Sequence, residues 1–346
     1  MASGSEDFNH WGPKHLSSVD WHNAEHRRSV SACLVKGAYV LESDRQETRG
    51  GSQCLAPPWW EAFNFKLVYQ LVDDVDDSIF GAIFEYNPPA YTYHRSPDRS
   101  PQYVFAFRGT VKKERSFSRD LDLNLGVVLN GLHESSRFKT AMKAVQDVVS
   151  VVGCSNVWLT GHSQGASTAM LAGKNMAKRG SFLEAYLFNP PFVSAPIERV
   201  KDGKLRHGLR FAGTLIKAGL AFAAADHNNS KGIEDSFTVI SGWIPCLFVN
   251  PLDPICAEYI GYFEHRRKLE DMGAGKLARL TSQHSLGNIA MNAVGLKGFQ
   301  TSEPLHLLPS ANLTVNLSST RDLSKDHGIN QWWRPDLNLS CRVYKY

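Results

Sequence analysis

The sequence lacks any long apolar run, and this absence argues against a membrane-spanning protein. A transmembrane helix needs about 18 or more consecutive, mainly apolar residues, and the 346 residues contain no such stretch. The N-terminal segment MASGSEDFNHWGPKHLSS also lacks the basic and then apolar layout of a signal peptide. We therefore expect a cytoplasmic protein without a leader or a membrane span.

Closely spaced cysteine and histidine motifs are also missing. The six cysteines include no C-x-x-C pair, and the thirteen histidines form no H-E-x-x-H motif. These motifs are the usual signatures of zinc sites and of redox-active cysteine pairs. We expect reduced thiols, no metal and no cofactor.

The chain carries little excess charge. The formal net charge is +4, and the basic residues are scattered in short runs. Nucleic-acid-binding proteins usually carry a concentrated basic surface, so we do not expect nucleic acid as a partner. Hydrophobic residues make up 42% and charged residues 21% of the chain, which is typical of a globular protein.

Apolar patterns predict an α/β fold with a mainly parallel sheet flanked by helices. An apolar stripe at steps of three and four from Phe138 to Val152 predicts a helix. Short apolar runs rich in branched and aromatic residues predict strands. Strands and helices alternate here, which implies right-handed crossovers and a sheet covered on both faces. The other predicted helices are 27–46 and 166–179, and the predicted strands are 78–87, 102–110, 157–162, 184–191, 236–243, 246–253 and 313–318.

One stretch interrupts this alternation. Residues 198–236 include an Ala-, Leu- and Phe-rich run at 209–225 and then a polar loop. We interpret this stretch as a helical insertion or cap, and its apolar run fits an acyl-binding cap and an ordinary core helix equally well. The expected organisation is a lead-in segment at residues 1–25 and a single domain at residues 26–346.

A nucleophile elbow is predicted at Ser163. The sequence GHSQG at 161–165 follows a predicted strand and opens a predicted helix. In G-x-S-x-G elbows the serine takes a strained turn that exposes its hydroxyl, and small residues such as Gly161 and Gly165 leave room for the neighbouring backbone. His162 is assigned to packing, because the base must approach from a separate loop. A glycine-rich turn without chemistry is the alternative.

A serine nucleophile needs a histidine base and a carboxylate that orients it. Asp253 follows a predicted strand in CLFVNPLDPIC and is the expected acid, although it also suits an N-cap for a helix starting at Pro254. His327 follows the strand predicted at 313–318 and is the expected base, with His284 as the alternative.

Two backbone amides are expected to form the oxyanion hole. Gln164 follows the nucleophile at a helix N-terminus, and Thr110 ends the strand in QYVFAFRGT. Both places are typical of oxyanion donors in hydrolases. A plain turn after a core strand is the alternative for Thr110.

Five segments together resemble a known family. FAFRGT, LTGHSQGAS, LFNPP, NPLDPI and DHGINQWW, in this order, are similar to class 3 (triacylglycerol) lipases of the α/β-hydrolase group. They are more similar still to plant proteins catalogued as "GDSL esterase/lipase", although no Gly-Asp-Ser-Leu occurs here. The resemblance implies an α/β-hydrolase fold with Ser163 as nucleophile, Asp253 as acid and His327 as base.

The expected function is a serine ester hydrolase acting on small acyl esters or lipids, with peripheral contact to a lipid surface. The familiar lipase elbow reads Gly-His-Ser-Leu-Gly-Gly, whereas Gln164 and Ala166 stand in this sequence. Two alternatives stay open, namely an α/β-hydrolase-fold binding or receptor protein and an acyltransferase that uses the same acyl-enzyme.

Overall fold

The structure is a computed structural model that describes residues 6–88, 99–110, 132–192, 237–271, 306–318, 320 and 322–346. The helices, with short 3-10 helices marked η, are α1 (Phe8–Trp11), α2 (Ala24–Gln46), η1 (Gly51–Gln53), α3 (Pro58–Glu61), η3 (Leu132–Glu134), α5 (Ser136–Val152), η4 (Cys154–Asn156), α6 (Gln164–Ala177), α10 (Glu258–Asp271), α13 (Leu323–His327) and η6 (Ile329–Trp333). The strands are β1 (Phe65–Val72), β2 (Ile79–Tyr86), β3 (Tyr103–Phe107), β4 (Val157–His162), β5 (Glu184–Phe188), β6 (Cys246–Val249), β7 (Ala311–Asn316) and β8 (Leu339–Tyr344).

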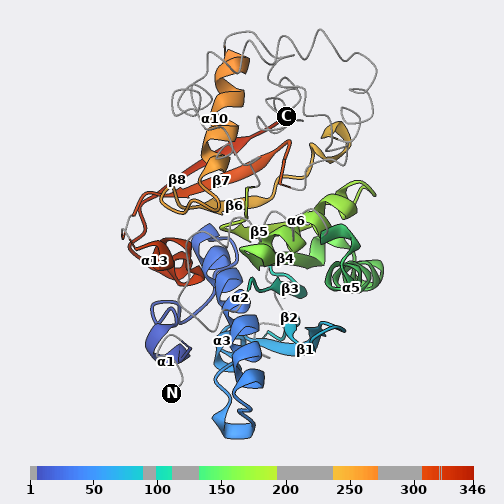
Figure 1. Cartoon of the computed structure of the whole chain (residues 1–346), viewed down its shortest axis with the longest axis vertical. Coiled ribbons are helices and arrows are strands. Elements are labelled where there is room, and N and C mark those ends of the chain that lie inside the picture. Colours follow the sequence, from blue (N-terminus) through green and yellow to red (C-terminus); the bar gives the residue numbers. More distant parts are fainter. Residues whose placement is uncertain are drawn as a thin grey trace, which may run out of the picture.

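These strands form one eight-stranded sheet whose spatial order follows the chain, from β1 to β8. Strands β3 to β7 run parallel to one another. The pairs β1–β2, β2–β3 and β7–β8 are antiparallel. Figure 1 shows the sheet rising from β1 near the lower end to β8 near the upper end. The predicted α/β-hydrolase class, with a mainly parallel sheet and flanking helices, is confirmed.

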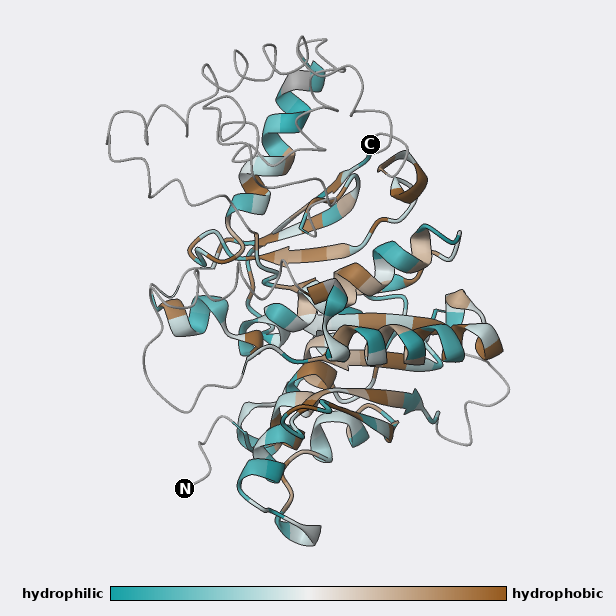
Figure 2. Ribbon diagram, turned by 45° about the vertical axis from the view of Figure 1, so that its right-hand side comes forward, coloured by the Kyte–Doolittle hydropathy of each residue, from teal (hydrophilic) through white to brown (hydrophobic). Residues whose placement is uncertain are grey.

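Helices cover both faces of this sheet because side chains alternate along its strands. On β3, Phe105 and Phe107 belong to the buried cluster that includes α5 and α6. Val104 and Ala106, the alternate residues, belong to the cluster that includes α2 and η6. A strand that is apolar on both faces must be buried on both, as expected for a parallel sheet. Figure 2 shows hydrophobic residues concentrated on the central strands and hydrophilic residues on α10.

Helix α5 follows the apolar stripe that predicts it. Phe138, Ala141, Met142 and Val145 are its buried residues. The Ser135 hydroxyl accepts a hydrogen bond from Phe138 N–H at 3.2 Å and caps the N-terminus. The helix is followed by Gly153 as its C-cap, and the positive φ of 83° at this residue favours glycine. The local sequence therefore determines both the extent and the buried face of this helix.

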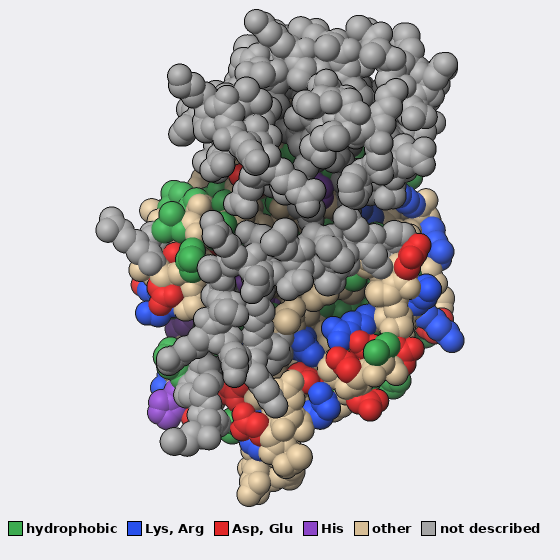
Figure 3. Space-filling model, viewed as in Figure 1, with side chains coloured by type: hydrophobic (Ala, Val, Ile, Leu, Met, Phe, Trp, Pro, Cys, Tyr) green, Lys and Arg blue, Asp and Glu red, His purple; other side chains and the backbone are tan. Residues whose placement is uncertain are grey.

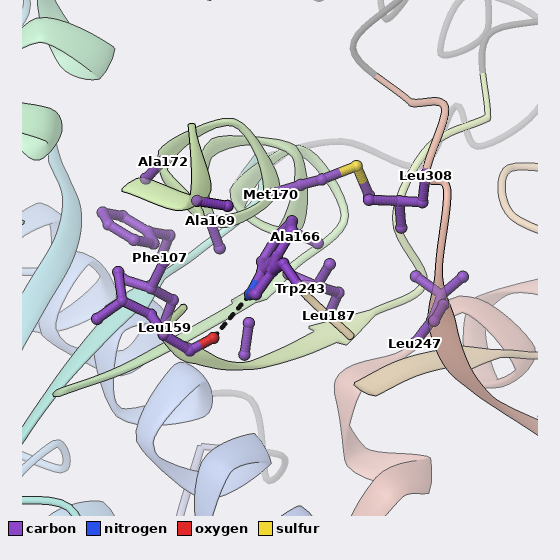
Figure 4. Packing of buried hydrophobic residues seen from close by; sticks show 14 of the residues in the cluster. Phe107, Leu159, Ala166, Ala169, Met170, Ala172, Leu187, Trp243, Leu247 and Leu308 are labelled. Atoms are coloured by element: carbon purple, nitrogen blue, oxygen red, sulfur yellow. Dashed lines mark hydrogen bonds between the residues drawn. The ribbon is translucent and has the colours of Figure 1, made fainter. Parts of the chain in front are cut away.

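The strand predicted at 236–243 is wrong, because residues 237–240 form a helical turn. Phe237 and Ile240 are buried, whereas Val239 between them is 51% exposed. Burial three residues apart is the spacing of a helix face and not of a strand. Trp243, which follows, donates from Nε1 to Leu183 O at 2.7 Å. Figure 4 shows its indole among the apolar residues of α6, β5 and β6.

The two edge strands β1 and β8 are not predicted from the sequence, which places the last strand at β7. Both edges are half solvated, with Tyr69 59% and Val343 53% exposed. The insertion predicted at 198–236 lies outside the described residues. None of the described helices is both long and apolar enough to span a membrane. Acidic and basic side chains are interspersed on the surface near β1 and α5 in Figure 3.

The N-terminal segment packs against distant parts of the chain. Trp21 is 3% exposed and makes edge contacts with the rings of Tyr86 and Trp158. Trp11 O accepts a hydrogen bond from Trp333 Nε1 at 2.8 Å. These contacts attach the start of the described chain to the sheet face that α2 and η6 cover.

Candidate active site

Ser163 lies at the turn between β4 and α6. Its φ of 54° and ψ of −127° are unusual for a residue with a side chain. Two hydrogen bonds hold this backbone, from Ser163 N–H to Phe188 O at 3.0 Å and from Ala166 N–H to Ser163 O at 2.9 Å. The strained turn therefore has the geometry of a nucleophile elbow.

The two glycines of the motif allow this turn to pack against neighbouring backbone. A Cβ at Gly161 would lie 2.3 Å from Gly165 O, and a Cβ at Gly165 would lie 2.3 Å from Phe107 O. Both distances are far below van der Waals contact. Side chains are thus excluded at both positions, and the start of α6 approaches the end of β3 closely.

Asp253 and His327 form a buried pair at the ends of β6 and α13. His327 Nδ1 lies 2.8 Å from Asp253 Oδ2, and the two residues are 7% and 1% exposed. Since a carboxylate only accepts, Nδ1 carries the proton in this bond. His327 Nε2 is then left as the nitrogen that could act as a base.

Three further donors hold the Asp253 carboxylate. Asn189 Nδ2 donates to Oδ2 at 2.7 Å and Cys256 Sγ at 3.1 Å, while Ile255 N–H donates to Oδ1 at 3.1 Å. Burial acts to raise the pKa of Asp253, but the bonds from His327 and the other donors outweigh it and hold the pKa below its ordinary value. The carboxylate therefore stays ionised. It also caps the turn at Ile255, so the capping and orienting roles coexist.

His162 is more than the packing residue that the sequence indicates. It is 5% exposed, and its Nδ1 lies 2.8 Å from Tyr39 OH and its Nε2 2.7 Å from His327 O. Burial, followed by the charge of His327, lowers its pKa to about 3. His162 is therefore neutral at physiological pH. Because His162 is next to Ser163 in the chain, its bond to His327 O holds the end of α13 close to the elbow.

Thr110 and Gln164 face each other beside the elbow. The Thr110 hydroxyl donates to Gln164 Oε1 at 3.2 Å. The backbone N–H of Gln164 belongs to the first turn of α6, where the N–H groups of a helix have no partner within the helix. The backbone N–H of Gly109, the residue before Thr110, donates to Tyr39 OH at 2.7 Å. The structure therefore brings the two predicted oxyanion residues together.

Two of the sequence interpretations cannot be placed. His284, the alternative base, and the apolar run at 209–225 both lie outside the described residues. Within the described ranges, no group of three or more His, Cys, Asp or Glu side chains is arranged to hold a metal ion.

Sequence reasoning missed two residues of this site, Tyr39 and Asn189. Tyr39 lies on α2, more than 120 residues before His162, its hydrogen-bond partner. Asn189 links Asp253 to Trp332, whose Nε1 donates to Asn189 Oδ1 at 2.6 Å. A weak signal for Asn189 exists, because Asn tolerates a positive φ better than most residues, and its φ is 45°.

Comparisons with known proteins point to one enzyme group. The family model for lipase (class 3) matches residues 95–195. A protein of Arabidopsis thaliana named "GDSL esterase/lipase" is 49% identical over 356 aligned positions, which cover 100% of this chain and 99% of that protein. Among solved structures, a lipase from Rhizopus microsporus var. chinensis is 18% identical, with a TM-score of 0.28. The alignment with it covers 49% of this chain and 59% of the lipase chain.

Proposed function

Because the chain belongs to the class 3 lipase-like α/β-hydrolases, we propose that it is a serine ester hydrolase that cleaves lipid-like acyl esters. In this proposal Ser163 is the nucleophile, His327 the base and Asp253 the acid. The substrate is a small acyl ester or a lipid, met in solution or at a lipid surface.

The observation that carries the proposal is the buried Asp253–His327 hydrogen bond beside the elbow. A carboxylate bound to Nδ1 keeps the proton on that nitrogen and leaves Nε2 as a base. The bond from His162 Nε2 to His327 O links the end of α13 to the residue before Ser163, which supports this role for His327. Such a carboxylate–imidazole pair is what a serine nucleophile requires of its base.

The proposed reaction has two halves. Ser163 Oγ attacks the ester carbonyl carbon while His327 Nε2 takes the hydroxyl proton, and the same nitrogen then protonates the leaving alcohol. An acyl-enzyme on Ser163 remains. Water, deprotonated by His327, attacks this acyl group, and the imidazolium then returns the proton to Ser163 Oγ as the acid is released. Asp253 stays ionised throughout and stabilises the imidazolium.

The oxyanion hole of the proposed reaction uses the backbone N–H groups of Gln164 and Thr110. The N-terminus of α6 carries a partial positive charge that favours an anion. Because the Thr110 hydroxyl points at the Gln164 side chain, the two residues are held at one place beside Ser163. One such donor typically contributes about 3 kcal/mol to lowering the barrier.

The test is labelling with a fluorophosphonate probe, together with hydrolysis of p-nitrophenyl esters from acetate to palmitate. Ser163→Ala should abolish both signals. Ser167→Ala is the matched control, because Ser167 is a buried serine one turn further along α6 and should keep both.

The proposal fails if the wild type shows neither labelling nor hydrolysis at any chain length. If the wild type is labelled but releases p-nitrophenol only after an alcohol acceptor is added, the enzyme transfers the acyl group to the alcohol and does not hydrolyse the ester.

A further inference from the structure

A chain of hydrogen bonds joins the loop after β3 to the C-terminal end of α13, which carries His327. Gly109 N–H donates to Tyr39 OH at 2.7 Å. Tyr39 OH lies 2.8 Å from His162 Nδ1, and His162 Nε2 lies 2.7 Å from His327 O. Tyr39 comes from α2 and His162 from the last position of β4. Four separate segments of the chain therefore meet through two side chains.

The direction of each proton in this chain is determined by chemistry. His327 O is a carbonyl and can only accept, so His162 Nε2 carries a proton. Burial keeps His162 neutral, with its pKa lowered to about 3, and Nδ1 is then a bare acceptor. Tyr39 O–H donates to Nδ1, and its oxygen accepts from Gly109 N–H. Every donor faces an acceptor in this one tautomer only.

We propose that Tyr39 and His162 are positioning residues. They fix the loop of Gly109 and Thr110, and the end of α13 at His327, relative to Ser163. This inference rests on the proposed function, since it gives these loops their meaning. Neither side chain is assigned a contact with substrate. Their contribution is geometric, because catalysis requires oxyanion donors and base to be held in place before the reaction begins.

A second anchor on Gly109 explains why the loop position matters. Arg108 Nη1 donates to Gly109 O at 2.7 Å, and Arg108 Nε donates to Ile79 O at 2.5 Å. The described peptide bonds include no cis bond, and in a trans peptide the C=O and the next N–H point in opposite directions. The Thr110 N–H is therefore directed away from Arg108. Tyr39 OH accepts from the N–H of Gly109, so the two peptide units that flank Gly109 are each held by one hydrogen bond.

The first test is Tyr39→Phe, which removes the hydroxyl and keeps the ring. It leaves Gly109 N–H and His162 Nδ1 without their partner. A displacement of about 1 Å can cost about 100-fold in rate, so we expect kcat to fall between about 10-fold and 100-fold with KM unchanged. The control is Tyr186→Phe, because the Tyr186 hydroxyl bonds to Arg27 and Glu184. It takes no part in the hydrogen bonds from Gly109 through Tyr39 and His162 to His327, which we call the bridge.

The outcome of this test is decided by the split between kcat and KM. A kcat within about twofold of wild type, or a change in KM alone, overturns the proposal. An equal fall of kcat in Tyr186→Phe also overturns it, because any buried tyrosine hydroxyl would then have the same effect.

A double-mutant cycle tests whether the two residues act as one unit. In His162→Gln the amide nitrogen can replace Nε2 as donor to His327 O, whereas the acceptor for Tyr39 is lost. If the bridge is the active element, the double variant with Tyr39→Phe loses no more kcat than the worse single variant. Multiplication of the two losses overturns the proposal.

The third test does not depend on activity. In the wild-type protein labelled with 15N-histidine, the signal absent from His162→Gln identifies His162. We expect a neutral Nε2–H imidazole that does not titrate down to about pH 5. A proton on Nδ1, or titration near the ordinary histidine pKa, overturns the bridge. If the bridge is present but the wild type hydrolyses no ester, the proposed function fails and the hydrogen-bond network stands.

Discussion

Replacement of Asp253 by Asn gives the sharpest test of the proposed acid. The carboxylate accepts from His327, Asn189 and Cys256 on Oδ2 and from Ile255 N–H on Oδ1. An amide has one acceptor and one donor end. If its oxygen remains on Ile255 N–H, its NH2 group faces His327 Nδ1, which can only answer as an acceptor. The imidazole proton then moves to Nε2, the nitrogen that should act as the base.

The size of the effect follows from this tautomer change. A histidine held in the wrong tautomer costs about 10⁴-fold in kcat, which corresponds to about 5.5 kcal/mol of barrier. The opposite amide orientation keeps the His327 tautomer but places NH2 against Ile255 N–H. It leaves that buried donor unsatisfied, at a cost of about 1–3 kcal/mol of stability. Asn189 Nδ2 also needs an acceptor at the position of Oδ2. Each amide orientation therefore leaves at least one buried donor without its acceptor.

The assay is kcat for a p-nitrophenyl ester at saturation, with thermal unfolding measured on the same samples. Asp44→Asn is the control, because Asp44 is a buried carboxylate that accepts from Leu55 and Ala56 N–H and lies on the C-terminal half of α2. It should lose stability and keep kcat. An Asp253→Asn variant that keeps both its stability and a kcat within about tenfold of wild type would refute the assignment of the acid, because neither amide orientation allows both.

Three other predictions concern the elbow and its surroundings. Gly165→Ala places a Cβ 2.3 Å from Phe107 O and should cost at least about 1–3 kcal/mol in denaturant unfolding, whereas Gly50→Ala, with nothing within 4 Å, should stay within about 0.5 kcal/mol of wild type. Gln164→Leu removes a polar side chain but keeps the backbone donor, so labelling by the fluorophosphonate should persist while the ester panel shifts toward longer acyl chains; an unchanged chain-length profile contradicts this. The pKa of His162 is lowered from 6.5 to about 3 in the folded state, so its stabilising contribution is complete above pH 6.5 and is lost as the pH falls toward 3. By about pH 5 the loss is about 2 kcal/mol, and His162→Gln should lack this loss in urea unfolding.

The central part of the fold could be predicted because its local patterns agree with its packing. The apolar stripe of α5 and the apolar runs of β3 to β7 are buried on the faces that their periodicity indicates. The edge strands β1 and β8 escaped prediction, since a strand with one solvated edge and exposed residues such as Tyr69 and Val343 lacks a clear apolar signal. At 237–240 a short apolar run fits a strand and a helical turn equally well, and only burial distinguishes them.

For the candidate site, sequence indicates the residue types but not the contacts that arrange them. Ser163 and Asp253 are visible because each follows an apolar strand in a characteristic turn. Tyr39 and Asn189 are not visible as partners, because their roles depend on which strand ends and which helix face lie side by side. Their assignment as catalytic or positioning groups stays a prediction for the experiments above.

The two neighbouring histidines have a consequence for how the proposed enzyme would respond to acid. The ring centroids of His162 and His327 lie 4.8 Å apart. Because the pKa of His162 is lowered to about 3, its ring keeps the same charge from about pH 5 upwards. The electrostatic field that His162 exerts on its neighbour should therefore stay constant over that range, and His162 should add no inflection of its own to the rate profile.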